Sequence, residues 1–259
     1  AASDVYKRQE VMPTILITGC SSGIGYATAL YLRQQGWRVI ASCRKTEDVM
    51  RLQQEGFECI KLDVTDSSEI NAAFDYIQTS GQLDAVFCNA GYGQPGCVED
   101  VPRAALREIF ETNVFGTWEV MNAALKIFRR QNHGRILVTS SILGFAAMHY
   151  RGAYNATKFA LEGMADTLRA ELYGSNIYIS LIEPGPIQSR FRPNSVEKLK
   201  QYIDLDDSFH QDFNQKQLQR LTAASNGNPF TLPASACAEA CFKALTAKKP
   251  KARYQVTFP

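Results

Sequence analysis

The sequence predicts an α/β fold in which one doubly wound parallel sheet is covered by helices on both faces, in a single domain. Short apolar runs rich in β-branched residues alternate with amphipathic helical segments along the whole chain. A glycine-rich turn follows the first run, and other polar residues also follow strands, at the edge where ligands bind in open parallel sheets. The 259 residues are 45% hydrophobic and 21% charged, which is enough for one large core.

Composition excludes several classes of protein. The net charge of +2 is too small for a nucleic-acid partner. Seven cysteines, an odd count, lie mostly inside apolar runs and are expected to be reduced thiols in a cytoplasmic protein. Cys237 and Cys241 share a helix face without a second ligand pair, which favours helix packing over a metal site. No run has the length of a membrane span or the pattern of a signal peptide.

The first residues look foreign to the fold. Asp4–Gln9 reads DVYKRQ, which resembles a translated sequencing adapter, so residues 1–11 are expected to be a non-native or disordered tail. Met12 is then a plausible native start, and 12–259 is the folded domain.

The first strand and the glycine turn predict a phosphate site. A β-branched run, Thr14–Thr18, precedes the spacing G-x-x-x-G-x-G and a helix over Tyr26–Gln35. Glycines let the backbone approach a pyrophosphate, and the helix N-terminus offers free N–H groups. A tight strand-to-helix connection without a ligand is the alternative. The predicted cofactor-binding residues of this turn are Gly19, Ser21, Ser22, Gly23, Ile24 and Gly25.

The second strand, Trp37–Ser42, is followed by the residues expected to select the cofactor. Cys43, Arg44 and Lys45 stand where an NAD site carries an acidic residue for the ribose 2′-hydroxyl. An arginine suits the 2′-phosphate of NADP instead, so Arg44 is the predicted contact. The alternative is a solvated charge pair that opens the next helix, Thr46–Glu55.

Two further strand ends carry polar residues. Asp63 follows strand Glu58–Leu62 and is predicted either to accept a hydrogen bond from an adenine amino group or to cap the next helix. Strand Leu83–Cys88 is followed by Asn89, Ala90 and Gly91, whose small side chains would let the backbone pack against the glycine turn.

The second half of the sheet brings further candidates to the same edge. One long helix is predicted over Pro102–Arg130, with Asn113 in its middle, where an asparagine is an unfavourable choice. Strand Gly134–Ser140 delivers Ser141, and strand Ile177–Glu183 ends at Pro184 and Gly185.

Tyr154 and Lys158 are four residues apart on a predicted helix, so their side chains share one face. A tyrosine titrates near ~10, and acid–base use near pH 7 would require a pKa lower by roughly three units, about 4 kcal/mol. A cation ~4 Å away at an effective dielectric of ~20 contributes about 4 kcal/mol. The alternative is an ordinary surface pair.

Periodicity weakens over residues 186–232, which mix aromatic and acidic side chains. A connection of this length inside a domain is usually functional, so we expect a lid over an apolar substrate pocket, with aromatics that anchor short helices as the alternative. A helix over Pro233–Ala247 and an edge strand over Ala252–Val256 are predicted to complete the chain.

The ordered motifs resemble the short-chain dehydrogenase/reductase family, over Pro13 to about Val256. They are TGCSSGIG at Thr18–Gly25, NAG at Asn89–Gly91, Asn113, Ser141, Tyr154-x-x-x-Lys158 and Pro184-Gly185, with thirteen residues from Ser141 to Tyr154. The resemblance implies a Rossmann-like fold. The sequence is most similar to the NADP-dependent branch with bacterial carbonyl and aldehyde reductases, and is similar to retinol and 17β-hydroxysteroid dehydrogenases.

This resemblance implies roles for the matching residues. Tyr154 would be the general acid, Lys158 would lower its pKa and bind the nicotinamide ribose, and Ser141 would orient the carbonyl oxygen. Asn113 would hold a water that links Lys158 to solvent. The glycines would cradle the phosphates, and the nicotinamide end of the cofactor site would include Pro184, Gly185, Ile187 and Ser189. Cys88 and Ser189 depart from the family's usual Asn and Thr.

The expected function is NADP(H)-dependent hydride transfer to an apolar aldehyde or ketone, reversible with the alcohol, and without a metal. A catalytically silent nucleotide-binding sensor or scaffold and an epimerase of the same fold are the alternatives; an intact catalytic set disfavours the first, and the lack of a larger substrate domain disfavours the second. The resemblance implies a homodimer or homotetramer. Relatives tend to run past Pro259, so we expect membrane contact only through a missing C-terminal tail.

Overall fold

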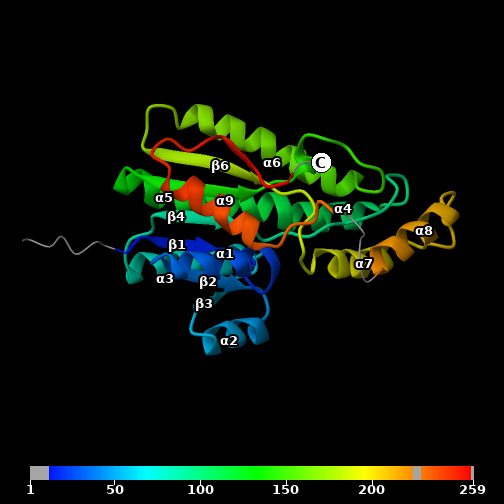
Figure 1. Ribbon diagram of the computed structural model, residues 1–259, viewed down its shortest axis with the longest axis horizontal. Coiled ribbons are helices and arrows are strands. Elements are labelled where there is room, and N and C mark those ends of the chain that lie inside the picture. The colour runs from blue at the N-terminus through cyan, green and yellow to red at the C-terminus, as the bar shows by residue number, and fades with distance from the viewer. Residues whose placement is uncertain (1–11, 224–228, 258–259) are drawn as a thin grey trace, which may run out of the picture.

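The computed structural model describes residues 12–223 and 229–257, in which one parallel sheet carries helices on both faces (Figure 1). The strand order is β3-β2-β1-β4-β5-β6-β7, and every neighbouring pair is parallel. The seven strands are β1 (Thr14–Ile17), β2 (Arg38–Cys43), β3 (Glu58–Lys61), β4 (Ala85–Cys88), β5 (Gly134–Thr139), β6 (Ile177–Glu183) and β7 (Arg253–Gln255). The predicted Rossmann-like fold and its strands are thereby confirmed. The proposed foreign tail, residues 1–11, lies outside the described residues.

The helices form two layers, because alternate strand residues are buried on opposite faces of the sheet. Leu16 belongs to a core shared with α3 (Ser67–Ser80), α5 (Thr117–Gln131) and α6 (Gly152–Glu171). Ile15 and Ile17 belong to the core on the other face, which includes residues of α1 (Gly23–Gln34), α2 (Thr46–Gln54) and α9 (Ser235–Thr246). Burial on both faces explains why the strands read as continuous apolar runs.

The long helix predicted over Pro102–Arg130 is not uniform. It begins as α4 (Arg103–Phe110), widens into a π-helical segment over Glu111–Gly116, and continues as α5. The π segment contains Asn113, whose amide bonds the backbone of Tyr92 outside the helix. An added Cβ at Gly116 would lie 2.6 Å from the Val64 carbonyl oxygen, so the chain also passes close to the end of β3 here.

The predicted lid is more regular than its sequence pattern suggested. It contains α7 (Phe191–Tyr202) and α8 (Gln211–Thr222), which Figure 1 shows at the end of the molecule toward which the strands' carboxyl ends point. A small core of its own joins Leu199 and Ile203 of this segment to Tyr150 and Leu221. The part of the predicted lid over 224–228 lies outside the described residues.

None of the helices in the described ranges combines the length and hydropathy needed to cross a bilayer.

The edge strand β7 is held by a buried charge cluster behind the carboxyl ends of the strands. Arg253 Nε lies 2.9 Å from Glu162 Oε2 of α6 and 3.2 Å from Glu183 Oε1, the last residue of β6. Glu183 is fully buried. Burial and the neighbouring Glu162 carboxylate raise the pKa of Glu183 to about 7, against the weaker opposing effect of Arg253.

This cluster predicts a pH-dependent gain of stability for Glu183→Gln. Between about pH 4.5 and pH 7, Glu183 keeps its proton in the folded state and loses it in the unfolded state. The free energy of unfolding therefore falls as pH rises through this window. At pH 8 the neutral amide should therefore stabilise the protein by about 1 kcal/mol, roughly 2–4 °C in thermal unfolding. At pH 5 the gain should vanish. Glu171→Gln, on the exposed end of α6, is the control, and an equal gain at both pH values would contradict the assignment.

Candidate active site

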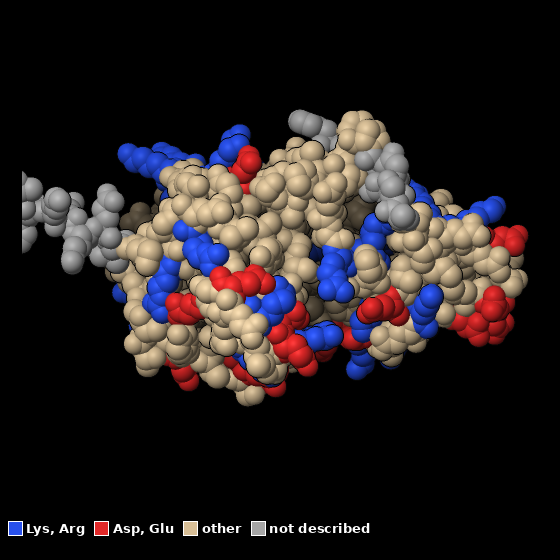
Figure 2. Space-filling view, turned by 60° about the horizontal axis from the view of Figure 1, so that its bottom comes forward, with Lys and Arg blue, Asp and Glu red and all other residues tan. Residues whose placement is uncertain are grey.

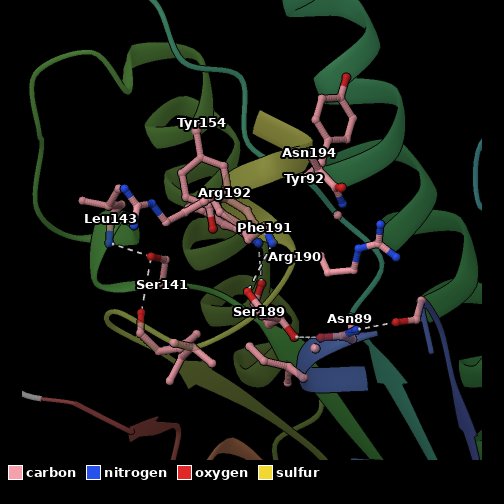
Figure 3. Close-up of a pocket in the computed structure, with 18 of the residues that line it drawn as sticks. Asn89, Tyr92, Ser141, Leu143, Tyr154, Ser189, Arg190, Phe191, Arg192 and Asn194 are labelled. Atoms are coloured by element: carbon pink, nitrogen blue, oxygen red, sulfur yellow. Dashed lines mark hydrogen bonds between the residues drawn. The ribbon is translucent and has the colours of Figure 1, made fainter. Parts of the chain in front are cut away.

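A cavity of about 690 Å³ opens at the carboxyl edge of the sheet, and most of the predicted site residues line it (Figure 3). The predicted residues in its wall are Gly19, Ser21, Ser22, Gly23, Ile24, Arg44, Asp63, Asn89, Ala90, Gly91, Ser141, Tyr154, Lys158, Pro184, Gly185, Ile187 and Ser189. Gly25 and Asn113 stand behind this wall. The parallel topology thus brings together residues from the glycine turn, the strand ends and α6.

The glycine turn has the shape that its sequence predicts. Gly19 and Gly23 adopt positive φ angles of 72° and 60°, which other residues rarely adopt. A Cβ at Gly19 would lie 2.9 Å from Ala90 Cα, and one at Gly25 would lie 2.3 Å from the Gly19 carbonyl oxygen. The expected packing of the Asn89–Gly91 segment against this turn is therefore confirmed. Gly25 serves the turn itself, and α1 begins at Gly23, earlier than the predicted Tyr26.

A chain of hydrogen bonds joins the glycine turn to the helix that carries Tyr154. Lys158 Nζ donates to the Thr139 carbonyl oxygen at 2.7 Å, and the Thr139 hydroxyl donates to Asn89 Oδ1 at 3.0 Å. Asn89 Nδ2 in turn donates to the carbonyl oxygens of Thr18 at 3.1 Å and Gly19 at 3.2 Å. The chain crosses β5, β4 and β1, so it sets the distance between the turn and α6.

Tyr154 is buried, and its ring meets that of Phe191 edge-on at 5.3 Å between centroids. Burial raises the pKa of the phenol above its ordinary value near 10, an effect that the Ser141 hydroxyl and the Arg151 charge only partly offset. Lys158 Nζ lies 5.4 Å from the centre of the Tyr154 ring, and burial lowers its pKa to about 8. Burial of the Tyr154 phenol therefore opposes the lowering of its pKa that the sequence predicts, and the Arg151 charge offsets burial only in part.

Ser141 follows β5 and contacts the residue that follows β6. Its hydroxyl donates to the Pro184 carbonyl oxygen at 3.5 Å and accepts from Leu143 N–H at 3.1 Å (Figure 3). These bonds hold the Ser141 hydroxyl beside the Tyr154 phenol, between the segments that contain Leu143 and Pro184. Ser189 lies next to the glycine turn, because a Cβ at Gly23 would be 3.1 Å from Ser189 Cβ.

Asp63 does not cap the helix that follows it, which was one of its two predicted roles. The N-cap of α3 is Asp66, which accepts from Ser68 N–H at 2.8 Å. Asp63 Oδ1 instead accepts from Thr65 N–H at 3.0 Å and from the Thr65 hydroxyl at 2.8 Å. Its carboxylate thereby folds the turn after β3 while it lines the cavity.

Asn113 has a different immediate role from the one the resemblance implies. Its Oδ1 accepts from Tyr92 N–H at 3.0 Å, and its Nδ2 donates to the Tyr92 carbonyl oxygen at 2.9 Å and to the Thr157 hydroxyl at 3.2 Å. The side chain is 1% exposed, so these bonds satisfy a buried amide. Asn113 therefore clamps the loop after β4 to α6, one residue before Lys158. This explains an asparagine in mid-helix.

Sequence reasoning missed four arginines that also line the cavity: Arg151, Arg190, Arg192 and Arg220. Arg151 was detectable, because it lies only three residues before Tyr154, at the start of the predicted helix. Arg192 and Arg220 belong to α7 and α8, and no local pattern connects them to Tyr154. Among the described residues, no three His, Cys, Asp or Glu side chains converge in a way that could hold a metal ion.

The clamp predicts that Asn113→Ala costs stability. The change leaves the N–H and carbonyl groups of Tyr92 without these buried partners, so the free energy of unfolding should fall by roughly 2–4 kcal/mol. Chemical denaturation measures it. Asn122→Ala, a partly exposed asparagine on α5, is the matched control and should cost under about 1 kcal/mol. Equal losses in the two variants would show that Asn113 is not a clamp.

Comparisons with known proteins show which proteins the chain is similar to. The chain is 36% identical over 258 residues to the uncharacterized oxidoreductase YbbO of Escherichia coli, covering 99% of this chain and 90% of that protein. It is 34% identical over 261 residues to human 17-beta-hydroxysteroid dehydrogenase type 1, covering 94% of this chain and 77% of that protein. A short chain dehydrogenase/reductase from Burkholderia phymatum, solved in complex with NAD, superimposes with a TM-score of 0.80 at 23% identity, over 95% of this chain and 89% of that one.

The sequence model of the short chain dehydrogenase family matches residues 13–200, which include the glycine turn, Ser141, Tyr154 and Lys158. This match spans most of the chain, and the relatives that share it extend over nearly all of the rest. The protein therefore belongs to the short-chain dehydrogenase/reductase family of oxidoreductases.

Proposed function

We propose that the protein is an NADP(H)-dependent oxidoreductase that transfers a hydride between the nicotinamide and an aldehyde or ketone with an apolar body, or the corresponding alcohol. The observation that carries the proposal is that Tyr154, Ser141 and Lys158 share one cavity with the glycine turn. Leu143, Phe191, Phe213 and Leu221 supply apolar walls around Tyr154. Three of these residues belong to the α7–α8 segment, which is the expected lid: Phe191, Phe213 and Leu221.

The chain's own residues fit a dinucleotide cofactor. The Ser22 side chain makes no capping bond to the first N–H groups of α1, and the glycine turn leaves their approach free of side chains. A helix N-terminus of this kind attracts phosphate. In this proposal Asp63 contacts the adenosine end of the cofactor, and Pro184, Gly185, Ile187 and Ser189 contact the nicotinamide end. When bound, the reduced cofactor supplies the hydride.

In the proposed mechanism, Ser141 donates a hydrogen bond to the substrate carbonyl oxygen and orients it. Tyr154 then donates its phenolic proton to the same oxygen as negative charge develops there. The raised pKa of Tyr154 keeps the phenol protonated at neutral pH, which suits an acid for reduction. Lys158, held by Thr139, adds positive charge beside the ring as the proton leaves.

Two other functions on the same fold receive less support. A catalytically silent sensor or scaffold needs no intact set of Ser141, Tyr154 and Lys158, and all three line the cavity here. An epimerase would call for a larger substrate-binding part, whereas the described chain adds only α7 and α8 to the sheet and its covering helices.

The reductase proposal predicts that the purified protein oxidises NADPH with some member of a panel of aldehydes, ketones, retinoids and steroids. Tyr154→Phe should lower kcat by about 10²–10⁴-fold, because the acid is lost, while NADPH binding by fluorescence titration stays within a few-fold. Tyr173→Phe, at a side chain that is 94% exposed, is the control. The proposal fails if no substrate in the panel supports NADPH oxidation.

NADP preference is proposed from Arg44. Its exposed side chain follows β2 and lines the cavity, on the side where a 2′-phosphate would lie, and no carboxylate takes the place of the usual NAD-site acid. Arg44→Asp should lower the ratio of kcat/KM for NADPH over NADH by about 10-fold or more, because the introduced carboxylate repels the phosphate. Lys45→Asp, next to it but outside the cavity wall, is the matched control. An unchanged ratio in Arg44→Asp would place the contact elsewhere.

We further propose a cytoplasmic homodimer or homotetramer. Phe115 and Trp118, in and just after the π segment, are 55% and 52% exposed and lie together in a shallow surface hollow with Ile70. Apolar side chains of this size favour association. The seven cysteines form no disulfide, in keeping with a reducing compartment. Light scattering should give a molar mass above one chain, and Trp118→Asp should lower it; a monomer at micromolar concentration would contradict the proposal.

A further inference from the structure

Three guanidinium groups from three different elements meet in the cavity on the side of Tyr154. Arg151 precedes the first turn of α6, Arg192 lies in the first turn of α7, and Arg220 lies in the last turn of α8. Arg192 donates a hydrogen bond to the Arg220 carbonyl oxygen, which ties α7 to α8 at this point. Burial is the main cause of the lowered pKa of Arg151, and the positive charges of Arg220 and Arg192 add to it. Arg192 and Arg220 are thus joined to each other, and the charges of both act on the Arg151 guanidinium.

No carboxylate of the described chain neutralises this cluster. Other arginines, such as Arg38, Arg51 and Arg253, form ion pairs at 2.6–3.3 Å with Asp or Glu. Among the described residues, none of the three cavity arginines has a carboxylate within 4.0 Å. The acidic residue in the cavity wall is Asp63, which belongs to the turn after β3. Because guanidinium stays charged and carries five donors, such a cluster requires an anion.

The cluster is built into the fold. Tyr150, the residue before Arg151, has a φ of 68°, a conformation that costs a tyrosine free energy. Tyr150 is 4% exposed, and its ring meets Phe213 of α8 edge-on at 5.5 Å. Arg151 Nη1 donates to the Tyr150 carbonyl oxygen at 3.0 Å, so the guanidinium is held by the residue that carries the strain. The contact with Phe213 therefore fixes Arg151 relative to α8.

Arg151 and Arg192 stand beside the reacting groups. The Arg151 charge acts on the Tyr154 phenol, and Phe191, which packs on that phenol, precedes Arg192. The proposed phosphate contacts of the dinucleotide are the glycine turn and Arg44. Figure 3 shows Arg190 and Arg192 pointing in different directions from the start of α7. In Figure 2, Lys and Arg side chains border a hollow beside the α7–α8 end of the molecule.

We propose that the substrate carries an oxyanion, a carboxylate or a phosphate, which Arg151, Arg192 and Arg220 bind while its carbonyl group lies at Tyr154. The inference rests on the proposed reductase function and names the substrate class of that same site. Apolar contacts with Phe213 and Leu221 lie in the same part of the cavity, so the substrate is an amphipathic oxo acid or oxo phosphate. Planar guanidinium groups suit both anions, because each accepts paired N–H bonds.

The test compares charged substrates with neutral counterparts in NADPH oxidation. The pairs are 4-oxobutanoate and 8-oxooctanoate with their methyl esters, and glyceraldehyde 3-phosphate with glyceraldehyde. The wild type should prefer the charged member of at least one pair by about 10- to 100-fold in kcat/KM, and the preferred pair distinguishes carboxylate from phosphate. Added salt should reduce this preference. Arg192→Met and Arg220→Met should each lower the ratio of charged to neutral kcat/KM about 10-fold or more, mainly through the KM of the charged member.

Arg129→Met is the matched control, because Arg129 is an exposed arginine on α5 that does not line the cavity. The ratio of charged to neutral kcat/KM in this variant should equal that of the wild type. Far-UV circular dichroism and thermal unfolding check that each variant folds. Equal kcat/KM for charged and neutral members in the wild type would overturn the inference and leave the reductase proposal standing. A rise in the KM of NADPH that is the same for both members would assign the arginines to the cofactor and also overturn it. Absence of NADPH oxidation with every substrate would instead refute the reductase proposal.

Discussion

The structure depends on one chain of hydrogen bonds across the carboxyl edge of the sheet. Lys158 reaches the Thr139 carbonyl oxygen, Thr139 reaches Asn89, and Asn89 reaches the backbone of Thr18 and Gly19. Each partner lies at the end of a different strand or on α6. These hydrogen bonds therefore fix the distance between the glycine turn and Tyr154. Lys158 and Thr18 are buried and Thr139 and Asn89 are half-buried, so loss of one bond would leave a polar atom with few other partners.

Burial sets the electrostatics of the site more than pairwise attraction does. Lys158 is near enough to the Tyr154 ring to influence it, yet desolvation moves the pKa of both groups toward their neutral forms, upward for the phenol and to about 8 for the ammonium. A protonated phenol beside a cation is the state that the reductive direction needs. In the proposed reduction, the phenol would keep its proton until negative charge builds on the carbonyl oxygen of the substrate.

The fold separates chemistry from substrate choice. Ser141, Tyr154 and Lys158 are positioned by β5, β6 and α6, which share the large cores of the sheet. Arg192, Arg220 and Phe213 belong to α7 and α8, which rest on a small core of their own. Under the proposed function, changes in α7 and α8 would alter substrate binding without disturbing the hydrogen-bond chain.

The sequence by itself determined the alternation of strands and helices, the glycine turn and the pairing of Tyr154 with Lys158, because strand periodicity, glycine spacing and helix geometry are local properties. The close packing of Ala90 on Gly19 also followed, since parallel strands end at one edge. Only the tertiary structure decided the π segment at Asn113, the direction of the Tyr154 pKa and the meeting of Arg151, Arg192 and Arg220. These depend on burial and on contacts between segments far apart in the chain, which no local pattern encodes.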